Sequence, residues 1–151
     1  MVFHLNPFLI ILRETPGKRV VIAAYGTVSL VVASQANFSG LLPTEIFHQS
    51  ELVSIDLSGS DTLQFPDLSQ RVFSKHLQNL TKLSYLHLHD VDMSSVAASS
   101  FKNLSSTLIS LDLNDTAQQG KFLEDVFHHP LLQWLNLSNN EKLTCNLRKS
   151  N

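Results

Sequence analysis

The 151-residue chain contains one cysteine, Cys145, and only five residues each of glycine and proline. A lone cysteine cannot close an intramolecular disulfide, and no Cys or His stands near it at the spacing of a zinc site. The few glycines and prolines contrast with 26 leucines and 19 serines. Such a bias is expected when one apolar ladder recurs between polar turns.

Positive charge is also sparse. Lys and Arg number 11 against 13 Asp and Glu, which gives a formal net charge of -2 and a pI near 6.4. The basic residues are scattered, so no basic stripe exists to neutralise a phosphate backbone. Nucleic acid is therefore not an expected partner.

Long hydrophobic runs are missing. The apolar run from Val20 to Ala33 is shorter than the roughly 20 residues of a membrane-spanning helix. Lys18 and Arg19 precede it and imitate the charged start of a secretory signal, but a typical signal begins near the first residue. We expect no transmembrane segment, and residues 1–27 stay unassigned as either a disordered stretch or an atypical targeting segment.

The sequence has none of the common catalytic motifs: no G-x-S-x-G, H-E-x-x-H, G-x-x-x-x-G-K or kinase H-R-D segment. A triad of Asp56, His87 and Ser110 can be drawn, but strands open to solvent supply no evident oxyanion hole. We therefore expect no catalytic residues and no enzyme activity.

A metal or cofactor site is not expected either. His87 and His89 would share one face of a strand, because they are two residues apart. His76 or His48 could complete a set of ligands, but sequence spacing fixes no third ligand.

One motif, L-x-x-L-x-L, recurs along the chain. Four clear copies follow a degenerate one, at intervals of 24, 31, 25 and 24 residues, and most of these intervals are typical of leucine-rich repeats. An isolated repeat buries only one face, so neighbouring repeats must stack. The copies are Val28/Val31/Ala33, Leu52/Ile55/Leu57, Leu83/Leu86/Leu88, Leu108/Leu111/Leu113 and Leu132/Leu135/Leu137.

The pattern predicts an α/β repeat solenoid over residues 28–151, with about four to five coils. Parallel strands would line the concave face, and irregular, 3-10 or short helical segments would form the convex face. The 31-residue interval requires an insertion near residues 61–72. At the corners, Asn140 holds the asparagine position of its repeat, where a buried side chain would bond backbone groups; Ser60, Val91 and Thr116 replace it in other copies.

Asparagine sequons are dense for this length, which favours a secreted or surface-exposed domain over chance occurrence in a Ser- and Thr-rich repeat. The five acceptor positions are Asn37, Asn79, Asn103, Asn114 and Asn136.

The segment Ala36-Asn37-Phe38-Ser39-Gly40-Leu41-Leu42-Pro43, with LVSIDLSGS, LISLDLNDTAQQGKF and LQWLNLSNNEKLT, resembles plant leucine-rich repeat receptor-like proteins of the disease-resistance type. The resemblance covers about residues 28–151 and suggests a fragment, because the paired-cysteine cap and the membrane span of the family are absent. It implies a cell-surface, plasma-membrane or extracellular location, defence signalling, and a co-receptor kinase as partner.

Residues between and beside the ladder leucines project from the concave sheet and are the candidate binding positions for a protein, peptide or glycan ligand. Tyr85 and Trp134 are the strongest candidates, because aromatic side chains with a polar group are enriched at interfaces. Glycans on Asn114 or Asn136 would obstruct this face. The candidates are Ser54, Asp56, Ser58, Tyr85, His87, His89, Ser110, Asp112, Asn114, Trp134, Asn136 and Ser138.

Asp56, His87, Asp112 and Asn136 hold equivalent positions on successive strands, so His87 is expected to lie between two carboxylates, one on each neighbouring strand. Two other functions remain open: a secreted leucine-rich inhibitor of a microbial enzyme, or a truncated gene product without independent activity. Neither is distinguished from a receptor module by the repeats alone.

Overall fold

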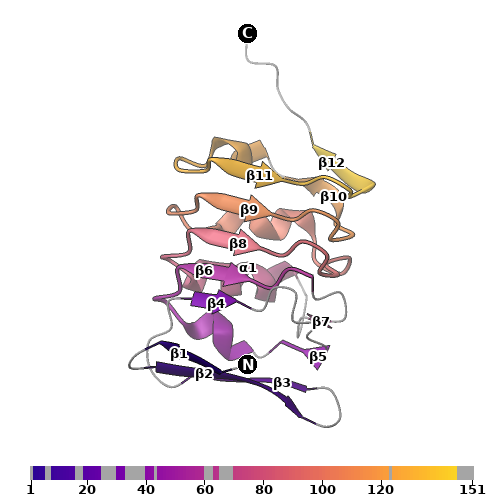
Figure 1. Ribbon diagram of the computed structural model, residues 1–151. Helices are drawn as coiled ribbons and strands as arrows, with labels where there is room; N and C mark the ends of the chain where they lie inside the picture. The colour runs from indigo at the N-terminus through magenta and orange to yellow at the C-terminus, as the bar shows by residue number, and fades with distance from the viewer. Residues whose placement is uncertain are drawn as a thin grey trace.

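The computed structural model describes residues 2–5, 8–15, 19–24, 30–32, 40–42, 44–59, 63–64, 70–122 and 124–145. Five parallel strands stack into one sheet, in the order β11-β9-β8-β6-β4 (Figure 1). Each strand belongs to a separate coil, so the fold is the predicted leucine-rich repeat solenoid. The strands are β4 (Leu30–Val32), β6 (Ser54–Asp56), β8 (Tyr85–His87), β9 (Ser110–Asp112) and β11 (Trp134–Asn136).

The register of the sheet confirms the alignment of the repeats. Val31 pairs with Ile55, and Ile55 pairs with Leu86. Leu86 then pairs with Leu111, and Leu111 with Leu135. The central ladder residue of every copy therefore occupies one row, although residues 28 and 33 of the first copy lie outside the described residues.

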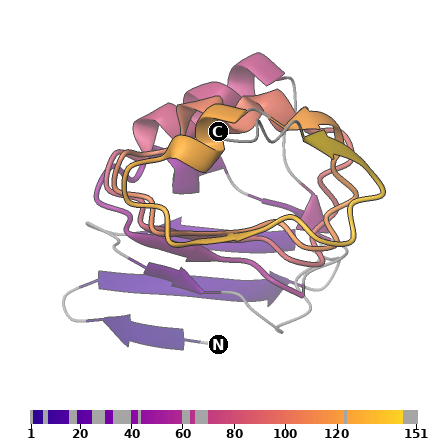
Figure 2. The same cartoon turned by 90° about the horizontal axis from the view of Figure 1, so that it is seen from above.

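Helical segments form the opposite side of each coil, as Figure 2 shows from above. Three are short 3-10 helices, η1 (Thr44–His48), η2 (Ala98–Asn103) and η3 (Glu124–His128). The fourth, α1 (Gln70–Asn79), is a ten-residue α-helix. It lies in the coil with the 31-residue interval, so part of the insertion lengthens the back of the coil while the sheet keeps its register.

The sequence did not predict three smaller sheets. Two are parallel pairs beside the main sheet: β5 (Gly40–Leu41) with β7 (Leu63–Gln64), and β10 (Gln119–Phe122) with β12 (Lys142–Cys145). The third is antiparallel and contains β1 (Val2–Leu5), β2 (Phe8–Thr15) and β3 (Arg19–Ala24). Within the described residues, no helix has the length and apolar character needed to cross a membrane.

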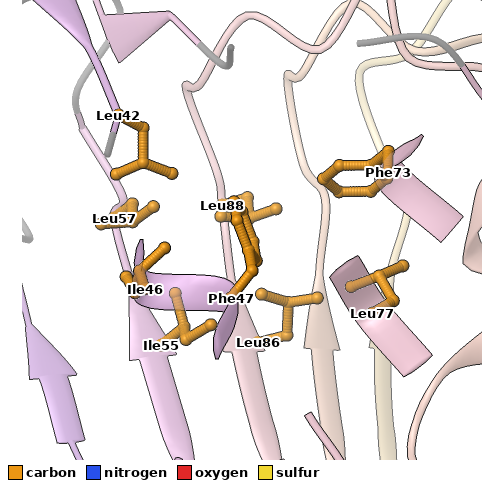
Figure 3. Close-up of a pocket in the computed structure, with 9 residues that line it drawn as sticks. All are labelled: Leu42, Ile46, Phe47, Ile55, Leu57, Phe73, Leu77, Leu86 and Leu88. Carbon is orange, nitrogen blue, oxygen red and sulfur yellow. The ribbon is translucent and has the colours of Figure 1, made fainter. Parts of the chain in front are cut away.

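The core is a leucine ladder behind the sheet. Leu52, Leu83 and Leu108 are at most 1% exposed. Side chains from η1, β6, β8 and α1 converge on one apolar cavity between coils (Figure 3). Its lining is entirely hydrocarbon, so it belongs to the packing of the coils and offers no polar group to orient a ligand. The lining residues are Leu42, Ile46, Phe47, Ile55, Leu57, Phe73, Leu77, Leu86 and Leu88.

Phenylalanine rings form a second row, on the helical side. The ring centroids of Phe47 and Phe73 are 6.3 Å apart, and those of Phe73 and Phe101 are 5.7 Å apart. The row continues from Phe101 to Phe122 at 6.1 Å and from Phe122 to Phe127 at 6.0 Å. We call these five residues the phenylalanine row. Because they come from four coils, they tie successive coils together.

Asn140 forms the corner that the sequence predicted. Its Nδ2 donates to the carbonyl oxygens of Leu113 (2.7 Å), Leu137 (3.0 Å) and Ser138 (3.1 Å). Its Oδ1 accepts from the backbone N–H groups of Thr116 (3.2 Å) and Gln118 (2.9 Å). One buried amide thus bonds backbone groups of two coils, among them the N–H groups of Thr116 and Gln118.

Gln118 is a second corner residue, which sequence reasoning missed. It is 1% exposed, and its Nε2 donates to the carbonyl oxygens of Met93 (2.8 Å) and Val96 (3.0 Å). Gln118 therefore joins its coil to the preceding coil, while Asn140 joins it to the following one.

Asp92 lies in the turn that follows β8, and the backbone N–H of Ser94 donates to its Oδ1 at 2.9 Å. Hydrogen bonds from the side chain and backbone of Ser94 lower the pKa of Asp92 below its usual 3.8. Its stabilising contribution is therefore present above that value and is lost as the pH falls through the lower, folded-state pKa.

We expect Asp92→Asn to reduce the free energy of unfolding slightly at neutral pH, because Asp92 is exposed. The difference from the unmodified chain should disappear in strong acid. Urea unfolding of both proteins at pH 7 and at a pH below the folded-state pKa measures this. A difference that is equal at both pH values would contradict the assignment.

Candidate functional site

The twelve candidate residues lie in three columns on the face of the sheet that points away from the helical segments. We call this surface the open face. The sheet register places the first and middle columns as predicted. The first column is Ser54, Tyr85, Ser110 and Trp134; the middle column is Asp56, His87, Asp112 and Asn136; the last column is Ser58, His89, Asn114 and Ser138.

The columns differ in exposure. Trp134 is 59% exposed and Tyr85 is 39% exposed, whereas Ser110, which lies between them in the first column, is 7% exposed. Ser58 is also buried, at 1%. The first column thus has two accessible aromatic side chains with a small residue between them. The uneven surface that they form can accept a side chain or ring of a partner.

The Asp and Asn side chains of the middle column accept hydrogen bonds from the backbone N–H groups two residues later in the chain. Oδ1 of Asp56 accepts from the N–H of Ser58 at 3.1 Å, and Oδ1 of Asp112 accepts from the N–H of Asn114 at 3.0 Å. Asn136 and Ser138 repeat the contact at 3.2 Å. Sequence reasoning missed this role, although Asp or Asn two residues before Ser or Asn is a known turn-forming pattern. These side chains are therefore fixed in place before any partner binds.

His87 pairs with Asp56 on one side and with Asp112 on the other, as predicted, and its side chain contacts Ser110. Nε2 of His87 lies 2.8 Å from Oγ of Ser110, and Oδ2 of Asp112 lies 3.9 Å from Nδ1 of His89. The reason is the turn contact of Asp112, which directs its carboxylate toward the end of the strand, where His89 stands. The order of the column is as predicted, and the carboxylate of Asp112 approaches His89, which is the other histidine of this face.

The contact between His87 and Ser110 brings together two members of the hypothetical triad. The third is not joined to them: among the described residues, no carboxylate hydrogen-bonds Nδ1 of His87, and Asp56 is held by Ser58. Ser110 is also largely buried. A nucleophilic serine requires a base that a third group orients and a nearby site for the oxyanion. The geometry therefore offers a hydrogen-bonded pair without that machinery.

The other two histidines considered as ligands, His48 and His76, lie on the helical side. Their ring centroids are 6.4 Å apart, and the ring of His76 stacks on Phe47 at 4.6 Å. They are thus separated from His87 and His89 by the sheet. No group of three or more His, Cys, Asp or Glu side chains is arranged for a metal ion in the part of the chain that the structure describes.

The predicted glycosylation positions fall on both sides of the solenoid. Asn79 ends α1 and is exposed, and Asn103 ends η2 and is half-buried. Asn114 is on the open face, where its Oδ1 accepts from Oγ of Ser138 at 2.9 Å. Asn136 is in β11 on the same face. Asn37 lies outside the described residues.

Comparison with known proteins agrees with the leucine-rich repeat. The chain is 36% identical over 105 residues to Receptor-like protein 9DC1 and 39% identical over 104 residues to Receptor-like protein Cf-9, both of Solanum pimpinellifolium. The chain is a leucine-rich repeat unit similar to a segment of plant receptor-like proteins. The alignments cover 70% and 69% of this repeat unit but only 12% and 11% of the two relatives. No protein-family profile matches it.

Solved structures support the fold of this repeat unit independently. It superposes on the leucine-rich repeat ectodomain of the receptor kinase SOBIR1 from Arabidopsis thaliana with a TM-score of 0.56 and 17% identity. The superposition covers 95% of this chain and 84% of that one. The predicted resemblance to leucine-rich receptor-like proteins and the predicted solenoid are thus both confirmed.

Proposed function

We propose that this repeat unit is a non-catalytic binding module of a plant cell-surface receptor-like protein, and that its open face binds a protein, peptide or glycan ligand. The observation that carries the proposal is the first column, in which Tyr85 and Trp134 are exposed on either side of the small Ser110. Aromatic side chains with a polar group are enriched at interfaces and dominate the energetics of many of them.

The polar groups beside the aromatic residues suit a ligand with hydrogen-bonding groups. His87 and His89 are half-buried in the neighbouring columns, and the ring of Tyr85 packs edge-on against that of His87, with centroids 6.5 Å apart. The side chains are held by the turn contacts of Asp56 and Asp112, so binding orders few new groups. The resemblance of the sequence to disease-resistance receptor-like proteins, together with its asparagine sequons, is the basis on which we extend the proposal to defence signalling, a co-receptor kinase and an extracellular, glycosylated location.

Two ligand libraries test the open face: random peptides displayed on phage, and arrayed oligosaccharides of plant and microbial cell walls. We expect peptides or glycans selected on the unmodified chain to bind Tyr85→Ala and Trp134→Ala roughly 10- to 30-fold more weakly, the loss typical of an aromatic hot spot. Titration by biolayer interferometry measures it. Gln78→Ala is the matched control, because Gln78 is exposed on α1, on the other side of the coil.

Ligands whose affinity is unchanged in both aromatic variants would refute the proposed face, and selections that return nothing above background in either library would refute the binding module.

Expression of the tagged chain in leaf cells tests the location separately. A mobility shift on glycosidase treatment supports entry into the secretory route, and an unshifted cytosolic product contradicts the receptor proposal.

A further inference from the structure

The open face is negatively charged where its strands end. Asp56 and Asp112 are the last residues of β6 and β9, and Asp90 and Asp115 lie in the turns that follow the last column. The strands β6, β8 and β9 each pair with a strand on both sides, so this charge does not depend on either end of the described chain. None of the 11 Lys and Arg residues lies in the strands and turns of this face, which span residues 54–59, 85–90, 110–115 and 134–139.

Local structure does not require the charge of the middle-column carboxylates. Oδ1 of Asp56 and Oδ1 of Asp112 each accept a backbone N–H from two residues later, and the neutral Asn136 makes the same contact at the equivalent position. An asparagine can therefore hold the same turn. The second oxygen of Asp112, Oδ2, lies 3.9 Å from Nδ1 of His89, which is beyond hydrogen-bond distance, so it can accept a hydrogen bond from a ligand.

The turns after the last column do not require charge either. Their backbone is left-handed, with φ of 61° at Asp90 and 50° at Asp115, a conformation that Gly, Asn and Asp adopt most readily. Gly59 and Asn139 hold the equivalent position in two other coils, at 71° and 58°, without a charge. Asp90 and Asp115 are exposed and lie on adjacent coils, since the N–H of Asp90 donates to the carbonyl oxygen of Asn114. Like charges on neighbouring coils repel, and a cationic group of a ligand would offset that repulsion.

Apolar side chains lie at the other end of the same strands. Tyr85 is 39% exposed and Val53 is 37% exposed, on adjacent coils that are joined by a hydrogen bond from the N–H of Tyr85 to the carbonyl oxygen of Val53 at 3.1 Å. Ile109 holds the repeat position of Val53 two coils further on and is half-buried. Lys82, in the turn before β8, is paired with Glu51 and adds no unpaired positive charge. The open face therefore has an apolar half at the strand starts and an acidic half at the strand ends.

We propose that the ligand of the open face is a protein or peptide segment that carries lysine or arginine beside an apolar or aromatic residue. This inference rests on the proposed function and narrows its ligand from three classes to one. The apolar side chain would pack on Tyr85 and Val53, and the ammonium or guanidinium group would pair with Asp112 and Asp90.

The spacing of the two halves suits neighbouring residues of one peptide. The middle column lies two residues, about 7 Å, further along each strand than the first column, a distance that long side chains can span. A neutral glycan has no charge to pair with the carboxylates, and an acidic ligand would be repelled by them.

Two displayed peptide libraries of equal diversity test the preference for charge: one omits Asp and Glu, and the other omits Lys and Arg. Selection on the unmodified chain takes place in low salt at pH 8, where histidine side chains generally carry no charge. The first library should yield roughly tenfold more binders, and their affinity should fall as salt is added. Equal yields, or more binders from the second library, would overturn the inference and leave the binding module intact.

Asp112→Asn tests the carboxylate itself, because it removes a charge and keeps the turn contact that Asn136 already makes. The selected peptides should bind this variant about three- to fivefold more weakly in biolayer interferometry. Asp125→Asn is the matched control and should bind them unchanged, since Asp125 is exposed in η3 on the helical side. No loss in Asp112→Asn, or an equal loss in both variants, would overturn the inference. Peptides that depend on Tyr85 but not on Asp112 would still support the proposed face.

Glucosamine oligosaccharides are the other source of positive charge to be compared, because each sugar carries an ammonium group but no apolar side chain. They should bind the unmodified chain roughly tenfold more weakly than the selected peptides. Oligosaccharides, charged or neutral, that bind as tightly as the peptides would overturn the choice of a peptide ligand. If neither peptides nor oligosaccharides bind, this inference fails together with the proposed function.

Discussion

Replacing Asn140 by alanine should lower the free energy of unfolding by about 3 kcal/mol, because several buried backbone groups would lose their partners at once. The N–H groups of Thr116 and Gln118 donate to this side chain, and the carbonyl of Leu113 would keep only its hydrogen bond from the Thr116 hydroxyl. For a chain of this size, the midpoint of thermal unfolding should fall by roughly 6–12 °C. Differential scanning calorimetry and urea titration measure both quantities.

Asn140→Asp provides a sharper comparison than alanine, since it keeps the shape of the side chain. The carboxylate would place an oxygen against the carbonyl oxygens of Leu113, Leu137 and Ser138, where the amide now donates. We therefore expect Asp to be at least as destabilising as Ala. Asn79→Ala is the control, because Asn79 is exposed; a loss at Asn79 equal to that at Asn140 would rule out the corner as the cause.

Phe101→Ala should be the most destabilising substitution in the phenylalanine row, at about 3–5 kcal/mol. Phe101 is 0% exposed and lies between Phe73 and Phe122 in the row. Removing its ring would open a cavity between coils and disconnect the two halves of the row. Because stacked repeats are stabilised chiefly by contacts with their neighbours, the unfolding transition should also become broader.

Phe127→Ala serves as the comparison within the same row. Phe127 is half-buried in the last described coil and has one ring neighbour, Phe122. Its loss should cost less than half as much as that of Phe101, because a partly exposed site can relax or admit water. Chemical denaturation of the two variants measures the ratio, and equal losses would show that the row does not transmit stability between coils.

The ladder could be predicted from the sequence because burial repeats with the coil. The spacing of Ile55, Leu86, Leu111 and Leu135 specified the register of the sheet. Asn140 was predictable for a related reason: it holds the asparagine position of the repeat, where a buried amide must bond backbone groups. These inferences depend on the local sequence pattern alone. The same pattern also predicted short helical segments on the other side of the coil.

The contacts that the sequence did not predict depend on side-chain direction. Position on the strand placed His87 beside Asp112, but the turn contact with Asn114 directed the carboxylate toward His89. The burial of Ser110 likewise depends on the neighbours that cover it. The links made by Gln118 also cross coils, so no local spacing indicates them.

The α-helix α1 shows that the helical side of a coil can change in length while the strand side keeps its register. The interval between Ile55 and Leu86 is longer than the others, yet their strands pair in the same register as the rest of the sheet. Part of the added length is thus taken up by α1 behind the sheet, without shifting the columns in front of it. Insertions and deletions in the back segments of such repeats should therefore accumulate with little effect on ligand choice, whereas point substitutions in the columns can change specificity while the coil keeps its shape.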